Sequence, residues 1–192
     1  MKNAVLFFFL VFQAFFSVVR AEDLPENSTY QISTKWINQE GGQVALSDFR
    51  GRPVIFSMVY LSCKFTCPTV VSEIQNIISK LNPKAKEQVK AVLVSFDPKR
   101  DTPEEMNKFL KKRNLDAKVW NFLTSKDERK IRELAATINF KYKKDDTGEF
   151  THSFIVAVLD ENGVLKVKLD GANQSKEALV NEIHKISKNL VP

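Results

Sequence analysis

Two cysteines carry most of the chemistry that this sequence could perform. Cys63 and Cys67 are its only cysteines, and three residues separate them. They lie between an apolar run at residues 53–60 and Pro68, a residue type that favours the first turn of a helix. The N–H groups and the positive dipole end at a helix N-terminus stabilise thiolate, which binds metals and attacks disulfides. We predict a chemical role, because a disulfide closing so small a loop would restrict the unfolded chain little.

Thiol–disulfide exchange and metal binding both remain open for this pair. Thioredoxin-type redox enzymes place two residues between their cysteines, whereas this chain has three, residues 64–66. Those enzymes also carry a cis-proline before the strand that faces the cysteines, but no proline lies between Pro103 and Pro192. His152 stands in that neighbourhood, just before the apolar run 154–159. A histidine at this position favours a metal site of two sulfurs and one imidazole.

A ligand set of Cys63, Cys67 and His152 suits a soft or borderline metal ion. Cu(I) prefers sulfur ligands and accepts a low coordination number, so this set fits it well. Structural zinc sites normally have four protein ligands, and one would be lacking. Cu(II) would need a further oxygen or nitrogen ligand and could oxidise the thiolates. The predicted metal is therefore copper, as Cu(I), with Cu(II) as the alternative.

The N-terminal residues predict that the protein is exported. Lys2 precedes an apolar run over residues 4–19, which is shorter than the about 20 residues of a spanning helix and suits a signal-peptide core. We expect residues 1–21 to be a signal peptide or, alternatively, a membrane anchor. Residues 22–30 are then a linker and residues 31–192 one domain. The expected location is the periplasm or the periplasmic side of the inner membrane, or the mitochondrial intermembrane space in a eukaryote.

Composition limits the classes of function. The 192 residues are 43% hydrophobic and 27% charged, which is typical of a globular protein. The 29 basic residues exceed the 23 acidic ones, for a net charge of +6, but the two signs are mixed along the chain. A scattered excess of this kind is typical of a solvated surface, so we expect no nucleic-acid partner. We also expect a monomer.

Apolar periodicity predicts an alternation of strands and helices. Strands are expected over residues 32–36, 43–46, 53–60, 89–96, 118–123, 154–159 and 164–169, and helices over 68–81, 102–113, 127–138 and 175–190. The first two strands form a hairpin around Gly41 and Gly42, and the last two form another around residues 160–163. This order predicts an α/β fold, namely a thioredoxin-like mixed sheet flanked by helices on both faces, with an N-terminal β-hairpin extension.

Several other residues are assigned to structure rather than to chemistry. We expect His184 to be solvated on the last helix and Met58 to lie in the core. Trp36 and Trp120 are interpreted as packing residues. The remaining polar residues of interest should shape the loop after residue 96 and cap the helix that follows: Asp97, Asp101 and Thr102.

Four motifs occur in order over about residues 30–190: Asp48-Phe49-Arg50-Gly51-Arg52-Pro53-Val54, Tyr60 with Cys63-x-x-x-Cys67-Pro68, Ser95-Phe96-Asp97-Pro98-Lys99-Arg100-Asp101-Thr102-Pro103, and His152-Ser153 followed by Leu159-Asp160-Glu161-Asn162-Gly163. In these motifs the sequence resembles the Sco/SenC family of copper chaperones for cytochrome c oxidase assembly. The resemblance implies Cys63, Cys67 and His152 as copper ligands. It also implies delivery to the binuclear copper centre of oxidase subunit II, or to another exported copper protein, and reduction of that subunit's cysteines. The family usually has Pro-Asp after the first cysteine, where this chain has Lys64-Phe65.

The leading hypothesis is therefore an exported copper metallochaperone, a binding protein rather than an enzyme. The alternative from the enzyme class is an exported thiol–disulfide reductase that uses Cys63 and Cys67 and does not need His152. A peroxidase of the peroxiredoxin or glutathione-peroxidase kind is disfavoured, because the motifs that surround the cysteines in those enzymes are missing.

Overall fold

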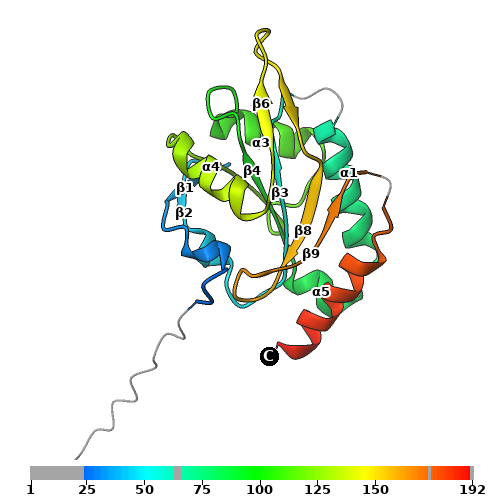
Figure 1. Ribbon diagram of the computed structural model, residues 1–192. Helices are drawn as coiled ribbons and strands as arrows, with labels where there is room; N and C mark the ends of the chain where they lie inside the picture. Colours follow the sequence, from blue (N-terminus) through cyan, green and yellow to red (C-terminus); the bar gives the residue numbers. More distant parts are fainter. Residues whose placement is uncertain (1–23, 63–65, 173, 191–192) are drawn as a thin grey trace, which may run out of the picture.

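The protein is built on one seven-stranded mixed sheet. The computed structural model describes residues 24–62, 66–172 and 174–190 (Figure 1). The strand order across the sheet is β2-β1-β5-β4-β3-β8-β9. A separate hairpin, β6–β7, stands at one end of it. The strands are β1 (Trp36–Asn38), β2 (Gln43–Val44), β3 (Val54–Val59), β4 (Lys90–Ser95), β5 (Trp120–Thr124), β6 (Tyr142–Lys144), β7 (Phe150–His152), β8 (Ile155–Leu159) and β9 (Leu165–Asp170).

Helices α1 to α4 lie in connections between these strands, and α5 follows the last strand. The α-helices are α1 (Thr66–Ser79), α2 (Pro83–Gln88), α3 (Pro103–Lys112), α4 (Glu128–Thr137) and α5 (Glu177–Asn189). Two short 3₁₀ helices, η1 (Thr29–Gln31) and η2 (Leu46–Phe49), precede β3. Thr102 caps α3 as the sequence predicts, since its hydroxyl accepts the N–H of Glu105 at 3.4 Å and Pro103 takes the first helical position.

The centre of the sheet is parallel and fully buried. β3 pairs with β4, and β4 with β5, in parallel register, while β8 joins β3 and β1 joins β5 in antiparallel register. Every residue of β3 is buried. Strands covered on both faces need continuous apolar sequence, which explains the apolar runs of β3 and β4. Met58, Trp36 and Trp120 all lie in this core, as expected.

The helices cover both faces of the sheet. The crossovers β3–α1–β4 and β4–α3–β5 step in the same direction across it, so the right-handed rule places α1 and α3 on one face. α5 contacts α1, β8 and β9 and therefore shares that face. Figure 1 shows α4 on the opposite side of the sheet from α1 and α5. The predicted α/β architecture is confirmed, with β8–β9 as its C-terminal hairpin and β1–β2 as its N-terminal one.

The segment expected to be a linker differs from the prediction. Ser28, Thr29 and Tyr30 are all buried, and the backbone N–H of Thr29 donates to the carbonyl of Gly163 at 3.0 Å. The Tyr30 ring lies directly against Gly163, where no side chain stands in its way. The expectation of a linker over residues 22–30 is therefore wrong from Ser28 onward, because this segment is pinned to the turn between β8 and β9.

Besides the 3₁₀ helices η1 and η2, the short helix α2 and the hairpin β6–β7 were not predicted. The first strand was expected over residues 32–36, whereas β1 spans Trp36–Asn38 and overlaps that range only at Trp36. The hairpin could have been found from its alternating aromatic residues, Phe140 and Tyr142 before the turn and Phe150 and His152 after it. Asp145 and Gly148 supply the turn between them, Gly148 with a positive φ of 88°.

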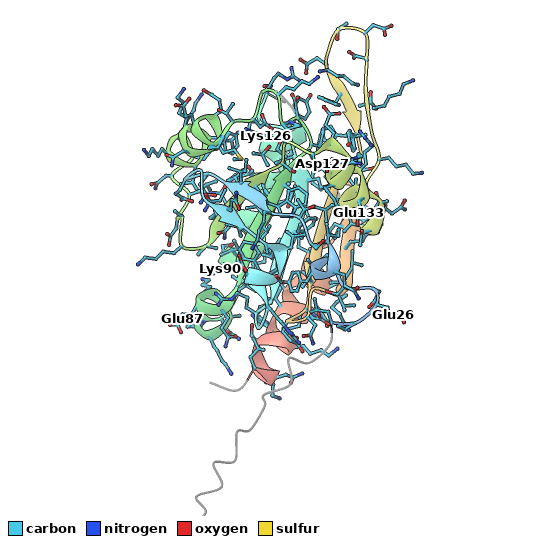
Figure 2. All side chains as sticks on the ribbon, turned by 90° about the vertical axis from the view of Figure 1, so that its left-hand side faces the viewer. Glu26, Glu87, Lys90, Lys126, Asp127 and Glu133 are labelled. Carbon is cyan, nitrogen blue, oxygen red and sulfur yellow. The ribbon has the colours of Figure 1, made fainter. Side chains whose placement is uncertain are left out.

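Charged side chains of both signs lie close together on the surface. Figure 2 shows Lys126 and Asp127 in the half of the molecule nearer the hairpin, and Glu87 and Lys90 in the other half. Among the described residues, no helix is both long enough and apolar enough to cross a membrane. The predicted signal peptide or anchor, residues 1–21, lies outside the described residues.

Candidate metal centre

The two cysteines lie in residues 61–67, called the cysteine segment, which leads from the end of β3 into the first turn of α1. β3 ends at Val59, and α1 begins at Thr66 and continues for 14 residues, so Cys67 occupies its second position. The unpaired N–H groups of this first turn favour a thiolate at that position. Cys63 and the side chain of Cys67 lie outside the described residues. The helix predicted after the cysteines is confirmed and begins two residues earlier than expected.

His152 is the last residue of β7, and Tyr142 is its partner across the β6–β7 hairpin. The sequence placed it just before the strand at 154–159, but it belongs to a short strand of its own. Its imidazole is half-buried among aromatic rings. The ring centroids of Phe96, Tyr60 and Phe140 lie 5.2, 5.7 and 5.9 Å from that of His152.

The contact with Tyr60 brings the histidine to the strand that leads into the cysteine pair. Tyr60 directly follows β3 and precedes Cys63 by three residues. The start of α1 and the β6–β7 hairpin lie at the same end of the molecule in Figure 1. The fold thus joins His152 to the region that holds the cysteines, although about half the chain separates them in sequence.

The hydrogen bond of His152 determines which ring nitrogen is available. Its Nδ1 lies 2.8 Å from the backbone carbonyl oxygen of Ser153. A carbonyl oxygen can only accept, so Nδ1 carries the proton and the neutral ring keeps its lone pair on Nε2. Metal-ligating histidines commonly donate their second nitrogen to a carbonyl in this way. A surface hollow of about 330 Å³ borders the residue, lined by Lys141, Tyr142, Lys143, Thr151, His152 and Ser153.

A buried carboxylate lies beside the entrance to the cysteine segment. Asp101 accepts the hydroxyl of Ser95 at 2.6 Å and the backbone N–H of Leu61 at 3.0 Å. Burial raises the pKa of Asp101 from 3.8 to about 6, although the bonds from Ser95 and Leu61 act in the opposite direction. Asp97 and Thr102 also shape this loop as expected. The carboxylate of Asp97 accepts the Nε–H of Arg100, and Thr102 caps α3.

The second histidine lies away from this region. His184 stands on α5, and its Nε2 accepts the backbone N–H of Asn82 at 3.1 Å. It therefore supports the start of α2 rather than being merely solvated. Among the described residues, no three His, Cys, Asp or Glu side chains gather closely enough to hold a metal ion. Sequence reasoning named Tyr60 and Arg100 only as members of motifs and did not consider Glu149, although the fold brings these three residues together beside the hairpin.

The arrangement of the sheet and helices defines a thioredoxin-like domain. Solved structures share it, among them the SCO1/SenC family lipoprotein of Bacillus anthracis (TM-score 0.72, 23% identity, 80% of this chain and 92% of that one). ScoI of Bradyrhizobium japonicum with copper bound has a TM-score of 0.65 at 22% identity, over 79% of this chain and 96% of its own. BsSco, described as a member of the Sco family of cytochrome c oxidase assembly proteins, has a TM-score of 0.68 at 22% identity, over 81% and 92%.

Sequence comparison assigns the family. The SCO1/SenC family model matches residues 22–188, so this chain belongs to that family. The SCO1 protein homolog of Bacillus subtilis is 29% identical over 99 residues, 51% of this chain and 50% of that protein. Protein sco1 of Schizosaccharomyces pombe is 28% identical over 156 residues, 77% of this chain and 57% of that protein. The chain thus spans about half the length of these curated relatives.

Proposed function

We propose that this protein is a copper metallochaperone. Cys63, Cys67 and His152 would hold one copper ion as cargo and deliver it to the binuclear copper site of cytochrome c oxidase subunit II. The observation that supports this most directly is the position of His152 beside Tyr60, with Nδ1 occupied by Ser153 and Nε2 left available. That tautomer keeps a lone pair on Nε2, which a third ligand would use.

Family membership supports copper as the cargo and oxidase assembly as the process. The related ScoI of Bradyrhizobium japonicum and yeast Sco1 have been solved with copper bound. BsSco is described as belonging to a family of cytochrome c oxidase assembly proteins. The family's Pro-Asp is replaced by Lys64-Phe65 here, which exchanges an acidic residue for a cation and bears on the surface that meets a client.

The chemistry of the ligands favours Cu(I). Two thiolates and a neutral imidazole form a soft, low-coordinate set, and the position of Cys67 at the start of α1 favours its thiolate. Delivery would proceed by ligand exchange, in which thiolates of the client replace those of the chaperone one after another without a change in oxidation state.

A competition titration with a Cu(I) chelator tests this function. The reduced protein should bind about one equivalent of Cu(I). Cys63→Ala and Cys67→Ala should abolish binding. His152→Ala should lower the Cu(I) affinity about tenfold or more, since even groups that only support a metal ligand contribute that much. His184→Ala is the matched control, since it removes the other histidine without touching the hairpin, and it should bind as the wild type does. Absence of Cu(I) binding by the reduced wild type would overturn the proposal.

Thiol–disulfide reduction is the second candidate, supported by the place of Cys67 in the first turn of α1. The two thiols would pass two electrons and two protons to a client disulfide and become a disulfide themselves. This activity needs both cysteines but not His152. Full biological activity of His152→Ala, together with loss of activity in Cys63→Ala, would favour the reductase over the metallochaperone.

The proposed location is the exported side of a membrane, with residues 1–21 as signal or anchor. One relative with the same fold is described as a lipoprotein, and another related protein is described as mitochondrial. We propose that the domain acts as a monomer in the periplasm or, in a eukaryote, in the intermembrane space. Fractionation of cells that express the full chain, combined with intact-mass analysis, would locate the protein and reveal any cleavage.

A further inference from the structure

The hairpin that carries His152 is not part of the main sheet. β6 and β7 pair with each other, and they form their own two-stranded sheet at the end of the molecule (Figure 1). A two-stranded hairpin alone is at best marginally stable in water. Side-chain contacts with the body of the domain, together with the two-residue connection from His152 to β8, therefore determine where His152 stands.

Aromatic packing supplies the first of these contacts. Phe96, buried at the end of β4, has its ring centroid 5.0 Å from that of Tyr142 and 5.3 Å from that of Phe150. Contacts of this kind bury apolar surface on the hairpin, and they tolerate small shifts between rings because they are weakly directional. They attach the hairpin without setting its position sharply.

Glu149 supplies directional contacts. The Tyr60 hydroxyl donates to its Oε2 at 3.1 Å, and Nη1 of Arg100 donates to its Oε1 at 3.0 Å. Both carboxylate oxygens are thus bound by groups of the domain body. The bond from Arg100, followed by the bond from Tyr60, holds the pKa of Glu149 below its usual range.

Arg100 contacts both the turn of the hairpin and the loop after β4. Its Nη2 donates to the backbone carbonyl of Gly148 at 3.1 Å, and its Nε donates to the buried carboxylate of Asp97. Its guanidinium carbon also lies 5.4 Å from the centroid of the Tyr60 ring and 5.8 Å from that of Phe150. The planar guanidinium therefore bridges the loop after β4 and the turn of the hairpin, a geometry that a lysine would not reproduce.

We propose that Tyr60, Arg100 and Glu149 form a latch that positions the β6–β7 hairpin, so that His152 is held beside the cysteine segment. They are positioning residues and do not bind copper. The effect of this latch on copper binding rests on the proposed metallochaperone function. The latch itself is a property of the copper-free protein. Tyr60 connects Glu149 to His152, because its ring packs against the His152 ring in a T-shaped pair with an interplanar angle of 85°, while its hydroxyl donates to Glu149.

The test compares Glu149→Ala with Asp146→Ala in the reduced, copper-free protein. Both variants remove one exposed carboxylate from the same hairpin, but Asp146 forms no hydrogen bond or ion pair with any residue that the structure describes. In ¹⁵N relaxation dispersion, which detects exchange on the μs–ms scale, Glu149→Ala should add exchange over residues 142–152 and shift the His152 ring signals. Asp146→Ala should leave both unchanged. Tyr60→Phe, which keeps the ring and loses the hydroxyl, should cause part of the same change.

Copper binding provides the second readout. Glu149→Ala should bind Cu(I) about two- to fivefold more weakly, the range expected for contacts at partly exposed positions, and Asp146→Ala should bind as the wild type does. Unchanged dispersion and ring signals in Glu149→Ala would overturn the latch, whatever the copper affinities are. Altered hairpin dynamics together with undiminished Cu(I) binding by His152→Ala would instead retain the latch and overturn the role of His152 in the proposed function.

Discussion

Asp101 and Leu61 join two distant parts of the chain at the entrance to the cysteine segment. Both carboxylate oxygens of Asp101 lie within hydrogen-bond distance of the Leu61 backbone N–H, at 3.0 and 3.2 Å. Asp101 is 1% exposed and belongs to the loop between β4 and α3. Leu61 stands two residues before Cys63, so this buried group fixes where the chain leaves β3.

Asp101→Ala should destabilise the protein by about 1–3 kcal/mol, because it leaves the Leu61 N–H and the Ser95 hydroxyl without their partner in a buried site. Urea unfolding at pH 7 measures this loss as a lower midpoint. Asp101→Asn should lose less, since its amide can accept from Leu61 and donate to Ser95. An alanine variant with the wild-type midpoint would contradict the anchoring role.

The free energy of unfolding should also depend on pH through the titration of Asp101. Its pKa is about 6 in the folded state against 3.8 in the unfolded chain, chiefly because of burial. The folded state therefore binds more protons between these values, so this contribution is fully present below pH 3.8 and is lost as the pH rises through about 6. The gain on acidification should reach about 3 kcal/mol at most.

The measurement is the difference in free energy of unfolding between wild type and Asp101→Asn from pH 7 to pH 4. The difference isolates Asp101 from carboxylates such as Glu149 and Asp145, whose pKa values are lowered and which act with the opposite sign. The wild type should gain relative to Asp101→Asn as the pH falls. A difference that stays constant over this range would show that the pKa of Asp101 is not raised.

Gly163→Ala should be strongly destabilising. Gly163 has a φ of +78°, and an added Cβ would lie 2.6–2.7 Å from ring atoms of Tyr30. Gly41 has a matching φ of +82° with no atom within 4 Å of its Cβ position, so Gly41→Ala isolates the backbone strain. We expect about 1 kcal/mol for Gly41→Ala and about 2–4 kcal/mol for Gly163→Ala in chemical denaturation. Equal losses would show that Tyr30 does not pack closely on this turn.

Cu(I) should protect the two thiols from alkylation. If Cys63 and Cys67 are both ligands, one equivalent of Cu(I) should slow their reaction with N-ethylmaleimide about tenfold or more, as followed by intact mass. His152→Ala should show weaker protection at the same copper concentration. Silver(I), another soft ion, should protect as well, whereas Mg²⁺ should not. Rapid alkylation of either thiol in the copper-loaded wild type would remove that cysteine from the ligand set.

Much of this protein follows from local sequence. The apolar runs of β3 and β4 predict strands buried on both faces, and Thr102-Pro103 predicts the start of α3, because each signal depends on near neighbours. The placement of Cys67 in the first turn of α1 follows from the same kind of reasoning. The motifs around Cys63 and His152 identify the family, which the family model confirms.

The long-range contacts of this protein were decided by tertiary structure alone. The meeting of Tyr60 with Glu149, the bond from Leu61 to Asp101 and the burial of Tyr30 against Gly163 each join residues distant in sequence. Such contacts depend on strand order and register and on how the hairpin packs, and no periodicity within a short window encodes them. The sequence by itself therefore determined which residues could do the chemistry. Only the packed sheet and the β6–β7 hairpin decided that His152 stands beside the strand that leads to the cysteines.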